Sequence, residues 1–251
     1  MTGRIEVLAT ADALAHAAAG RFVLAAHAAI ETSGRFAVAL SGGSTPRAFY
    51  TLLATEPYAS RVEWPRVQWF WSDERCVPPD AAASNYRMAR EALLDRVPVA
   101  AASIHRIHGE DDPTEAAAAY ERTLRETFAT PAGARFDLVL LGMGVDGHTA
   151  SLFPGGSAVR ERQRWVMAEY VKSVSMWRVT LTPVVINAAA DVAFVVAGRE
   201  KATMLHRVLE GPYRPDALPA QVVAPSDGHA RWLVDAAAAG ELSEEVRKER
   251  G

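Results

Sequence analysis

Apolar runs of strand length alternate with alanine-rich or amphipathic stretches along most of the chain. The short runs predict buried strands, and the longer periodic stretches between them predict helices. Expected strands cover residues 5–8, 36–40, 67–71, 104–107, 136–141, 165–171, 178–182 and 192–198. Expected helices run to about residue 31 after an N-cap at Thr10, to about residue 96 after a start at 84–86 capped by Ser84, and over 47–53, 113–128, 183–189 and 199–205. This alternation predicts an α/β fold with a mainly parallel sheet covered by helices on both faces.

The composition is that of an ordinary soluble globular protein. The 251 residues are 49% hydrophobic and 23% charged, which is material for one large domain or two small ones. We expect a single α/β domain over 1–240 and a charged, flexible tail at 241–251. The formal net charge of -3 provides no overall attraction to nucleic acid or to an acidic membrane. An anionic ligand must therefore be bound by a local group of basic side chains.

The N-terminal and cysteine patterns favour a cytoplasmic protein, which we expect to be a monomer or a weak homodimer. The alanine-rich stretch after Met1 is interrupted by charged residues and histidines, and it contains no secretory cleavage site. The single cysteine, Cys76, excludes an internal disulfide and suits a reducing compartment. The seven histidines show no HExxH spacing and no CxxC motif is present, so no metal site is predicted.

The glycine-rich segment after the 136–141 strand contains the most distinctive candidate residues. Three glycines with G-x-G-x-x-G spacing bracket Asp146, and His148 follows directly. That spacing is typical of a dinucleotide-binding turn, but the dinucleotide motif needs a full helix after its last glycine, and Pro154 interrupts the chain too soon. We expect a single helical turn here, with the carboxylate and the imidazole directed at one spot. In the alternative interpretation, Asp146 only caps that turn and His148 forms local hydrogen bonds.

The loop after the 36–40 strand has the features of a phosphate site. Pro46 fits the first position of the following helix, and the loop before it contains two glycines and three hydroxyl side chains: Ser41, Gly42, Gly43, Ser44 and Thr45. Backbone N–H groups, hydroxyls and the helix dipole would all favour an anion. Because the loop lacks the lysine of a nucleotide P-loop, a monophosphate is the expected ligand. The alternative for this loop alone is a tight connection without a ligand.

Three charged residues, Asp73, Glu74 and Arg75, follow the aromatic strand at 67–71. Charges directly after a buried strand are costly unless they face a polar cleft or are paired. Arg75 can bind a carboxylate or a phosphate in a forked geometry. The alternative is that Asp73 or Glu74 pairs with Arg75 and simply closes the loop.

Two further basic residues are candidate ligands for an anion. Arg178 is placed at the start of the 178–182 strand, and Lys201 lies in the first turn of the helix expected at 199–205. The N-terminal end of a helix is the unfavourable end for a cation. This placement indicates that Lys201 faces an anion, although a solvated surface lysine fits the position equally well.

The polar segments that begin at Ser41, Asp73, Gly142 and Gly198 all follow the carboxyl ends of apolar strands. In open α/β sheets, ligands bind at that edge. The shared position predicts that these segments form one site.

Six segments also resemble a known family: 40–46 (LSGGSTP), 72–75 (SDER), 84–86 (SNY), 141–155 (LGMGVDGHTASLFPG), 178–182 (RVTLT) and 198–201 (GREK). They are similar, in the same order, to the 6-phosphogluconolactonases, and the resemblance covers roughly residues 5–240. It implies a modified Rossmann-like fold shared with glucosamine-6-phosphate deaminases. It also implies hydrolysis of 6-phospho-D-glucono-1,5-lactone to 6-phospho-D-gluconate in the oxidative pentose phosphate pathway, without metal or organic cofactor. Residues 172–177 depart from the pattern, because relatives often have a proline-rich approach there.

For such a reaction we hypothesise that His148 takes a proton from water and returns it to the departing ring oxygen, while Asp146 orients the imidazole. The resemblance implies that Arg75 lies near the sugar or the carbonyl. It further implies that the 41–45 loop, Arg178 and Lys201 hold the 6-phosphate, and Asp73 completes the predicted substrate-binding residues.

Two other functions compete with lactone hydrolysis. An amino-sugar-phosphate isomerase or deaminase would carry a carboxylate a few residues beyond the loop histidine, but here no acid occurs between His148 and Glu161. A non-catalytic sugar-phosphate sensor would need an appended DNA-binding or partner module, and we expect one domain to fill this chain.

Overall fold

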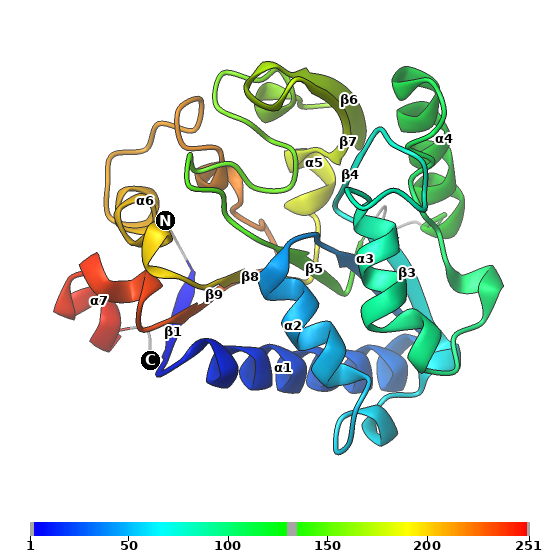
Figure 1. Cartoon of the computed structure of the whole chain (residues 1–251), viewed down its shortest axis with the longest axis horizontal. Helices are drawn as coiled ribbons and strands as arrows, with labels where there is room; N and C mark the ends of the chain where they lie inside the picture. Colours follow the sequence, from blue (N-terminus) through cyan, green and yellow to red (C-terminus); the bar gives the residue numbers. More distant parts are fainter. Residues whose placement is uncertain (1–2, 130–134, 250–251) are drawn as a thin grey trace.

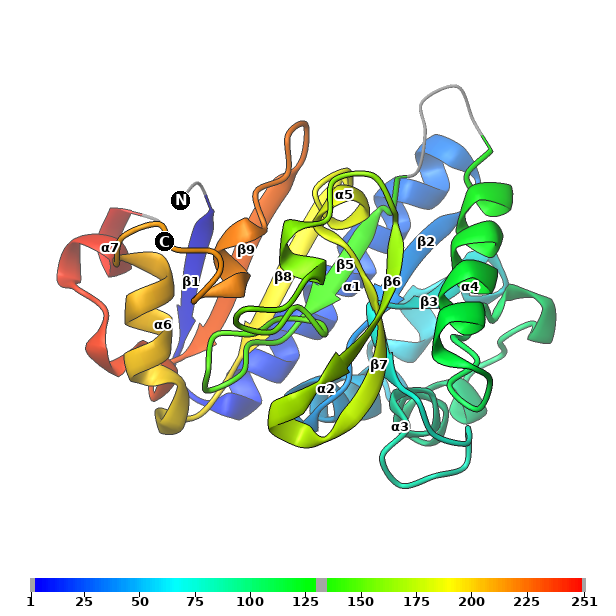
Figure 2. The ribbon, with the colours of Figure 1, turned by 90° about the horizontal axis from the view of Figure 1, so that it is seen from above.

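A parallel sheet of six strands forms the centre of the protein. The computed structural model describes residues 3–129 and 135–249. Figure 2 shows the six strands in the order β1-β9-β8-β5-β2-β3, each parallel to its neighbours. Their bounds are β1 Arg4–Leu8, β2 Phe36–Leu40, β3 Val67–Trp71, β5 Leu138–Leu141, β8 Asp191–Val196 and β9 His229–Asp235. The predicted α/β fold with a mainly parallel sheet is thus confirmed.

The central strands β2, β5 and β8 are buried along their whole length. Strands covered on both faces need continuous apolar sequence, which explains why these three lack the polar–apolar alternation of a half-exposed strand. The edge strand β1 is largely exposed. In Figure 1, α1 (Ala11–Ser33) and α2 (Ser44–Leu53) lie on one side of the sheet.

The first helix, α1, begins at the predicted cap and ends two residues later than expected. The Thr10 hydroxyl accepts the N–H of Ala13 at 3.1 Å, and Gly34 ends the helix with φ 76°. By length and hydropathy, α1 is apolar enough to cross a membrane. Half of its apolar window is buried inside this fold, however, as in the core helix of a globular protein.

The sequence did not predict a second sheet, of three antiparallel strands in the order β4-β7-β6. Its strands are β4 Asp73–Arg75, β6 Val166–Val171 and β7 Met176–Leu181. The Ser72 N–H donates to Leu40 of the parallel sheet, and the Ser72 carbonyl accepts from Leu181 of the second sheet. The chain therefore passes from one sheet to the other at Ser72. The charged triplet expected in a loop is in fact a strand.

The second sheet lies on the opposite side of the parallel sheet from α1, together with α4 (Pro113–Thr127) and α5 (Pro183–Ile186). The remaining helices are α3 Asn85–Ala92, α6 Ala202–Leu209 and α7 Glu244–Glu249. The last of these occupies the segment expected to be a flexible tail, and Leu242 just before it is buried.

Several other predicted boundaries were wrong. The expected strand at 104–107 is only a single bridge between Ile104 and Trp69. The helix expected to start at residues 84–86 and to run to about residue 96 is capped by Ser84, as its sequence predicts, but it ends at Ala92 and is followed by a short 3-10 turn. Similarly, α2 begins at Ser44, so Pro46 is its third residue instead of its first.

Candidate active site

A cavity of about 460 Å³ lies at the carboxyl ends of β8, β5, β2 and β3, which are consecutive in the sheet. Its walls are the loops after these strands and the turn between β6 and β7. This is the volume of a small-molecule site. All predicted site residues line it except Ser44 and Thr45: Ser41, Gly42, Gly43, Asp73, Arg75, Asp146, His148, Arg178 and Lys201.

His148 and Asp146 form a hydrogen-bonded pair in the loop after β5. The imidazole Nδ1 lies 2.5 Å from Asp146 Oδ1, and the backbone N–H of His148 donates to the same oxygen at 3.1 Å. The ring stacks on Phe153 with centroids 4.1 Å apart. About a third of the His148 side chain is exposed, at 31%. The imidazole is therefore fixed on two sides and still open to the cavity.

The ionisation of Asp146 determines which nitrogen of His148 carries the proton. Partial burial opposes ionisation, but the hydrogen bonds and charge of His148 outweigh it and hold the pKa of Asp146 below its ordinary value. A carboxylate can only accept, so Nδ1 of a neutral imidazole must be the donor. Nε2, which has no hydrogen bond to any described residue, is then available as a base.

The loop that carries this pair contains no helical turn, which corrects the prediction. Between 142 and 155 the chain forms turns and one isolated bridge, between Thr149 and Leu152. Gly147 has φ 83° and Ala150 has φ 47°, and such left-handed residues interrupt a helix. The Gly144 N–H donates to the His148 carbonyl at 2.8 Å and closes the loop. The dinucleotide interpretation, which required a helix here, is excluded by the same geometry.

Gly144 leaves no room for a side chain beside the His148–Asp146 pair. A Cβ at this position would lie 2.1 Å from His148 Nδ1 and 2.5 Å from Asp146 Oδ1. We expect Gly144→Ala to displace the imidazole and to lower kcat about 100-fold, the usual cost of a displacement of about 1 Å. Gly20→Ala is the matched control, because nothing lies within 4 Å of a Cβ there. Equal turnover of both variants would contradict this placement.

Arg75 and Arg178 are opposite each other on the neighbouring strands β4 and β7. Both line the cavity, and the Nε of each is buried without a hydrogen-bond partner in the described parts of the chain. Burial lowers the pKa of Arg178, Asp73 opposes this effect and Arg75 adds to it. Like charges directly opposite on paired strands destabilise a sheet. The arrangement is that of a site for an anion bound between the two guanidinium groups.

The alternative that Arg75 pairs with a neighbouring acid is not what the structure contains. Among the described residues, no ion pair joins Arg75 to Asp73 or Glu74; its Nη1 donates to the Ala83 carbonyl at 2.5 Å. Asp73 instead accepts the Ser151 hydroxyl at 2.7 Å. This bond links β4 to the loop of His148.

The loop after β2, residues 41–45, is called the glycine loop below, and its residues 41–43 form another wall of the cavity. Ser41 is bonded at its N–H and its carbonyl to the Tyr50 hydroxyl, at 3.0 and 3.1 Å. A Cβ on Gly42 would lie 1.8 Å from Asn85 Oδ1, so only glycine fits there. Ser44 and Thr45 lie just beyond this wall, in the first turn of α2.

Lys201 completes the basic side of the cavity. It is the last residue of a 3-10 turn over Arg199–Lys201 and the N-cap of α6, and does not lie inside the helix as expected. Gly198, with φ 101°, allows the sharp change of direction after β8. The lysine lines the same cavity as the two arginines. That it contacts an anion stays a prediction.

Several lining residues were not among the predicted ones, including Phe153 under the imidazole, Asn85 beside Gly42, and Ser173 and Val174 at the β6–β7 turn. Asn85 was visible only as part of the SNY segment. No group of three or more His, Cys, Asp or Glu side chains in the described chain is arranged to hold a metal ion.

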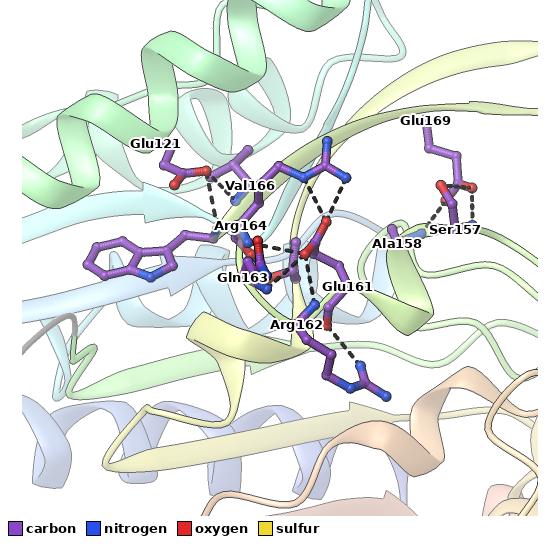
Figure 3. A network of polar contacts seen from close by, with 11 residues as sticks. Glu121, Ser157, Ala158, Glu161, Arg162, Gln163, Arg164, Val166 and Glu169 are labelled. Carbon is purple, nitrogen blue, oxygen red and sulfur yellow. Dashed lines mark hydrogen bonds and ion pairs between the residues drawn. The ribbon is translucent and has the colours of Figure 1, made fainter.

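The irregular segment 155–164, whose polar sequence is typical of a rim or lid and which is called the rim below, is held by carboxylates (Figure 3). Glu169 of β6 accepts the N–H of Ser157 at 2.5 Å. Glu161 accepts the N–H groups of the next three residues, and Glu121 of α4 accepts those of Trp165 and Val166. The segment is thus held by one of its own carboxylates, Glu161, and its ends are held by carboxylates of β6 and α4.

The hydrogen bonds to Glu161 make the rim sensitive to acid. These bonds lower the pKa of Glu161 to about 2. The bond from the N–H of Gln163 contributes most, and the bonds from Arg164 and Arg162 lower the pKa further. Because this pKa lies below that of the unfolded chain, the stabilisation is complete above the ordinary glutamate pKa and is lost as the pH falls toward 2.

We therefore expect Glu161→Gln to lower the melting temperature at neutral pH by a few degrees. The difference from the wild-type protein should narrow between about pH 6 and about pH 3, measured by thermal unfolding. Glu126→Gln, at an exposed position on α4, is the control. A difference independent of pH would contradict the role given to the carboxylate.

Comparison with known proteins gives the cavity its context. Residues 9–232 match the family described as glucosamine-6-phosphate isomerases/6-phosphogluconolactonase. The chain belongs to this family. It is 41% identical over 247 residues to the 6-phosphogluconolactonase of Nostoc sp., which covers 97% of this chain and 100% of the relative. Identity to the Haemophilus influenzae 6-phosphogluconolactonase is 35% over 201 residues, or 80% of this chain and 85% of the relative.

Solved structures of the glucosamine-6-phosphate isomerase/6-phosphogluconolactonase family have the same architecture. The 6-phosphogluconolactonase from Trypanosoma cruzi superposes with a TM-score of 0.86 at 32% identity, covering 97% of this chain and 98% of that one. A monomeric glucosamine-6-phosphate deaminase superposes with a TM-score of 0.78 at 20% identity, over 95% of this chain and 99% of that one. The deaminase likeness establishes the shared fold alone.

Proposed function

We propose that the protein hydrolyses 6-phospho-D-glucono-1,5-lactone to 6-phospho-D-gluconate, a step of the oxidative pentose phosphate pathway. The observation that carries the proposal is that one cavity contains both the His148–Asp146 pair and the opposed arginines Arg75 and Arg178. The first pair suits acid–base chemistry on an ester, and the second suits a phosphate dianion. The named relatives in the family support the same reaction.

In this mechanism, His148 Nε2 accepts a proton from a water molecule as the water oxygen attacks the lactone carbonyl. The resulting imidazolium is stabilised by the ionised Asp146. The tetrahedral intermediate then collapses, the bond to the ring oxygen breaks, and His148 returns its proton to that oxygen. His148 thus ends the reaction in its starting protonation state, and no covalent intermediate forms on the protein.

Binding of the phosphate end orients the lactone carbonyl relative to His148. We propose that Arg178, Lys201 and the loop from Ser41 to Thr45 bind the 6-phosphate, and that Asp73 accepts a sugar hydroxyl. Arg75, which the resemblance places near the sugar or the carbonyl, is opposite Arg178, and we propose that it also contacts the phosphate. Binding energy from this remote group can hold the carbonyl against the imidazole and so lower the barrier to attack.

An assay with two readouts tests the proposal. We expect the purified protein to accelerate loss of the phosphorylated lactone above its spontaneous hydrolysis, and to release no ammonia from glucosamine 6-phosphate. Ammonia release would favour the deaminase alternative. Against that alternative, Glu161, the first acid after His148, is occupied by the rim N–H groups and does not line the cavity.

Binding of 6-phosphogluconate without turnover would favour the sensor alternative. We further propose a cytoplasmic monomer or weak homodimer that binds neither nucleic acid nor membrane. The net charge of -3 and the single cysteine support this proposal. Sedimentation at several protein concentrations tests the oligomeric state.

A further inference from the structure

Glu74, the middle residue of β4, is buried away from solvent, with 3% exposure. Successive residues of a strand point to opposite faces, so Glu74 is directed away from its neighbours Asp73 and Arg75, which line the cavity. The proposed mechanism uses both neighbours but gives Glu74 no task. A buried carboxylate is costly unless its oxygens are fully hydrogen-bonded.

Four hydrogen bonds saturate the Glu74 carboxylate. One oxygen, Oε1, accepts the N–H of Arg75 at 2.8 Å and of Asn85 at 2.7 Å. The other, Oε2, accepts the N–H of Tyr86 at 2.8 Å and the hydroxyl of Ser84 at 3.0 Å. Three of the donors belong to the start of α3, where backbone N–H groups otherwise lack partners. The carboxylate thereby attaches the N-terminus of α3 to β4, and the helix dipole favours its negative charge.

The segment attached by Glu74 contacts two walls of the cavity. On one side, the carbonyl of Ala83 accepts Nη1 of Arg75 at 2.5 Å. On the other side, the Asn85 amide donates to the Asp73 carbonyl at 2.9 Å, and its Oδ1 packs against Gly42 so closely that no Cβ fits. The positions of the Arg75 guanidinium and of the glycine loop therefore both depend on where α3 begins.

We infer that Glu74 is a positioning residue that sets the spacing between the Arg75 guanidinium and the glycine loop, and thereby the affinity of the site for phosphate. The inference rests on the proposed function in one respect, namely that a phosphate group binds between these walls. Glu74 acts through Arg75 and Asn85 and does not touch the substrate. Its effect should accordingly appear in binding more than in the chemical step.

Glu74→Gln tests the inference with little change of shape. One carboxylate oxygen becomes an NH₂ group that faces two donors, so the start of α3 must shift. We expect the KM for the lactone and the dissociation constant for inorganic phosphate each to rise about tenfold or more, since hydrogen bonds to a charged group contribute about that much. The value of kcat should change by less than about threefold, because His148 is held by a different loop.

Glu91→Gln is the matched control, because Glu91 lies on α3 but outside the cavity, in an exposed pair with Arg87. A lower melting temperature for Glu74→Gln with unchanged KM and phosphate affinity would reduce Glu74 to a structural role and overturn the inference. If Glu74→Gln does not fold, the phosphate affinity of Ser84→Ala tests the inference instead, because this substitution removes only one of the four bonds to the carboxylate. Unchanged phosphate affinity in a folded Ser84→Ala protein would likewise overturn the inference.

Phosphate binding, measured by calorimetry, separates the two proposals. A wild-type protein that binds phosphate but leaves the lactone intact would refute the proposed function, and the effect of Glu74→Gln on phosphate affinity would still be measured. A wild-type protein with no affinity for phosphate would overturn the inference about Glu74 itself.

Discussion

Replacing His148 with alanine is expected to lower kcat about 1,000-fold, toward the rate of spontaneous lactone hydrolysis. The substitution removes the only imidazole that lines the cavity among the described residues, and with it the proposed base for water and the proposed acid for the ring oxygen. The KM should change little, because the basic residues that would hold the phosphate are untouched. Initial rates of lactone loss, corrected for the uncatalysed reaction, measure both constants.

His27→Ala is the control for this substitution, because His27 is exposed on α1 and its one ion pair with the described residues is the helical pair with Glu31. Its turnover should equal that of the wild-type protein. A His148→Ala enzyme with more than about a tenth of the wild-type kcat would be incompatible with general acid–base catalysis by this residue, which normally contributes at least about 100-fold.

Replacing Arg178 with methionine is expected to raise the KM about 100-fold while leaving the melting temperature unchanged or higher. The substitution removes the charge-assisted bond that we propose between Arg178 and the 6-phosphate, which costs about 2 to 3 kcal/mol of binding. The free protein, however, loses a half-buried charge that lies opposite Arg75 in the sheet. Methionine retains an unbranched apolar stem and so preserves packing.

Steady-state kinetics and thermal unfolding of the same preparation test both parts of this expectation. Arg122→Met, at an exposed position on α4, is the control and should change neither quantity. A marked loss of stability with an unchanged KM would mean that Arg178 supports the sheet and does not bind the substrate.

The location of the cavity was predictable because it depends on local sequence. Each apolar strand that ends in glycines or charges identifies its own carboxyl end, and parallel strands bring those ends together at one edge. For this reason Ser41, Arg75, His148 and Lys201 were assigned to one site, and all four line the cavity.

The second sheet was not predictable, because its strands are joined by contacts between residues distant in sequence. Asp73 pairs with Thr180 and is bonded to Ser151, and neither partner can be found from the spacing of polar residues. The single bridge at Ile104 has the same cause: residues 104–107 met the pattern of a short strand, but the chain stays beside β3 for one residue pair only. Tertiary contacts decided these elements, not intrinsic propensity.

The passage of the chain between the two sheets at Ser72 also bears on selectivity for substrate length. The Asp73–Ser151 bond and the bond from the Ser151 N–H to Thr180 tie the histidine loop to the strands that carry both arginines. Buried contacts thus fix the distance between His148 and the two arginines. We therefore expect that a phosphorylated lactone one carbon shorter could not contact the imidazole and the arginines at the same time.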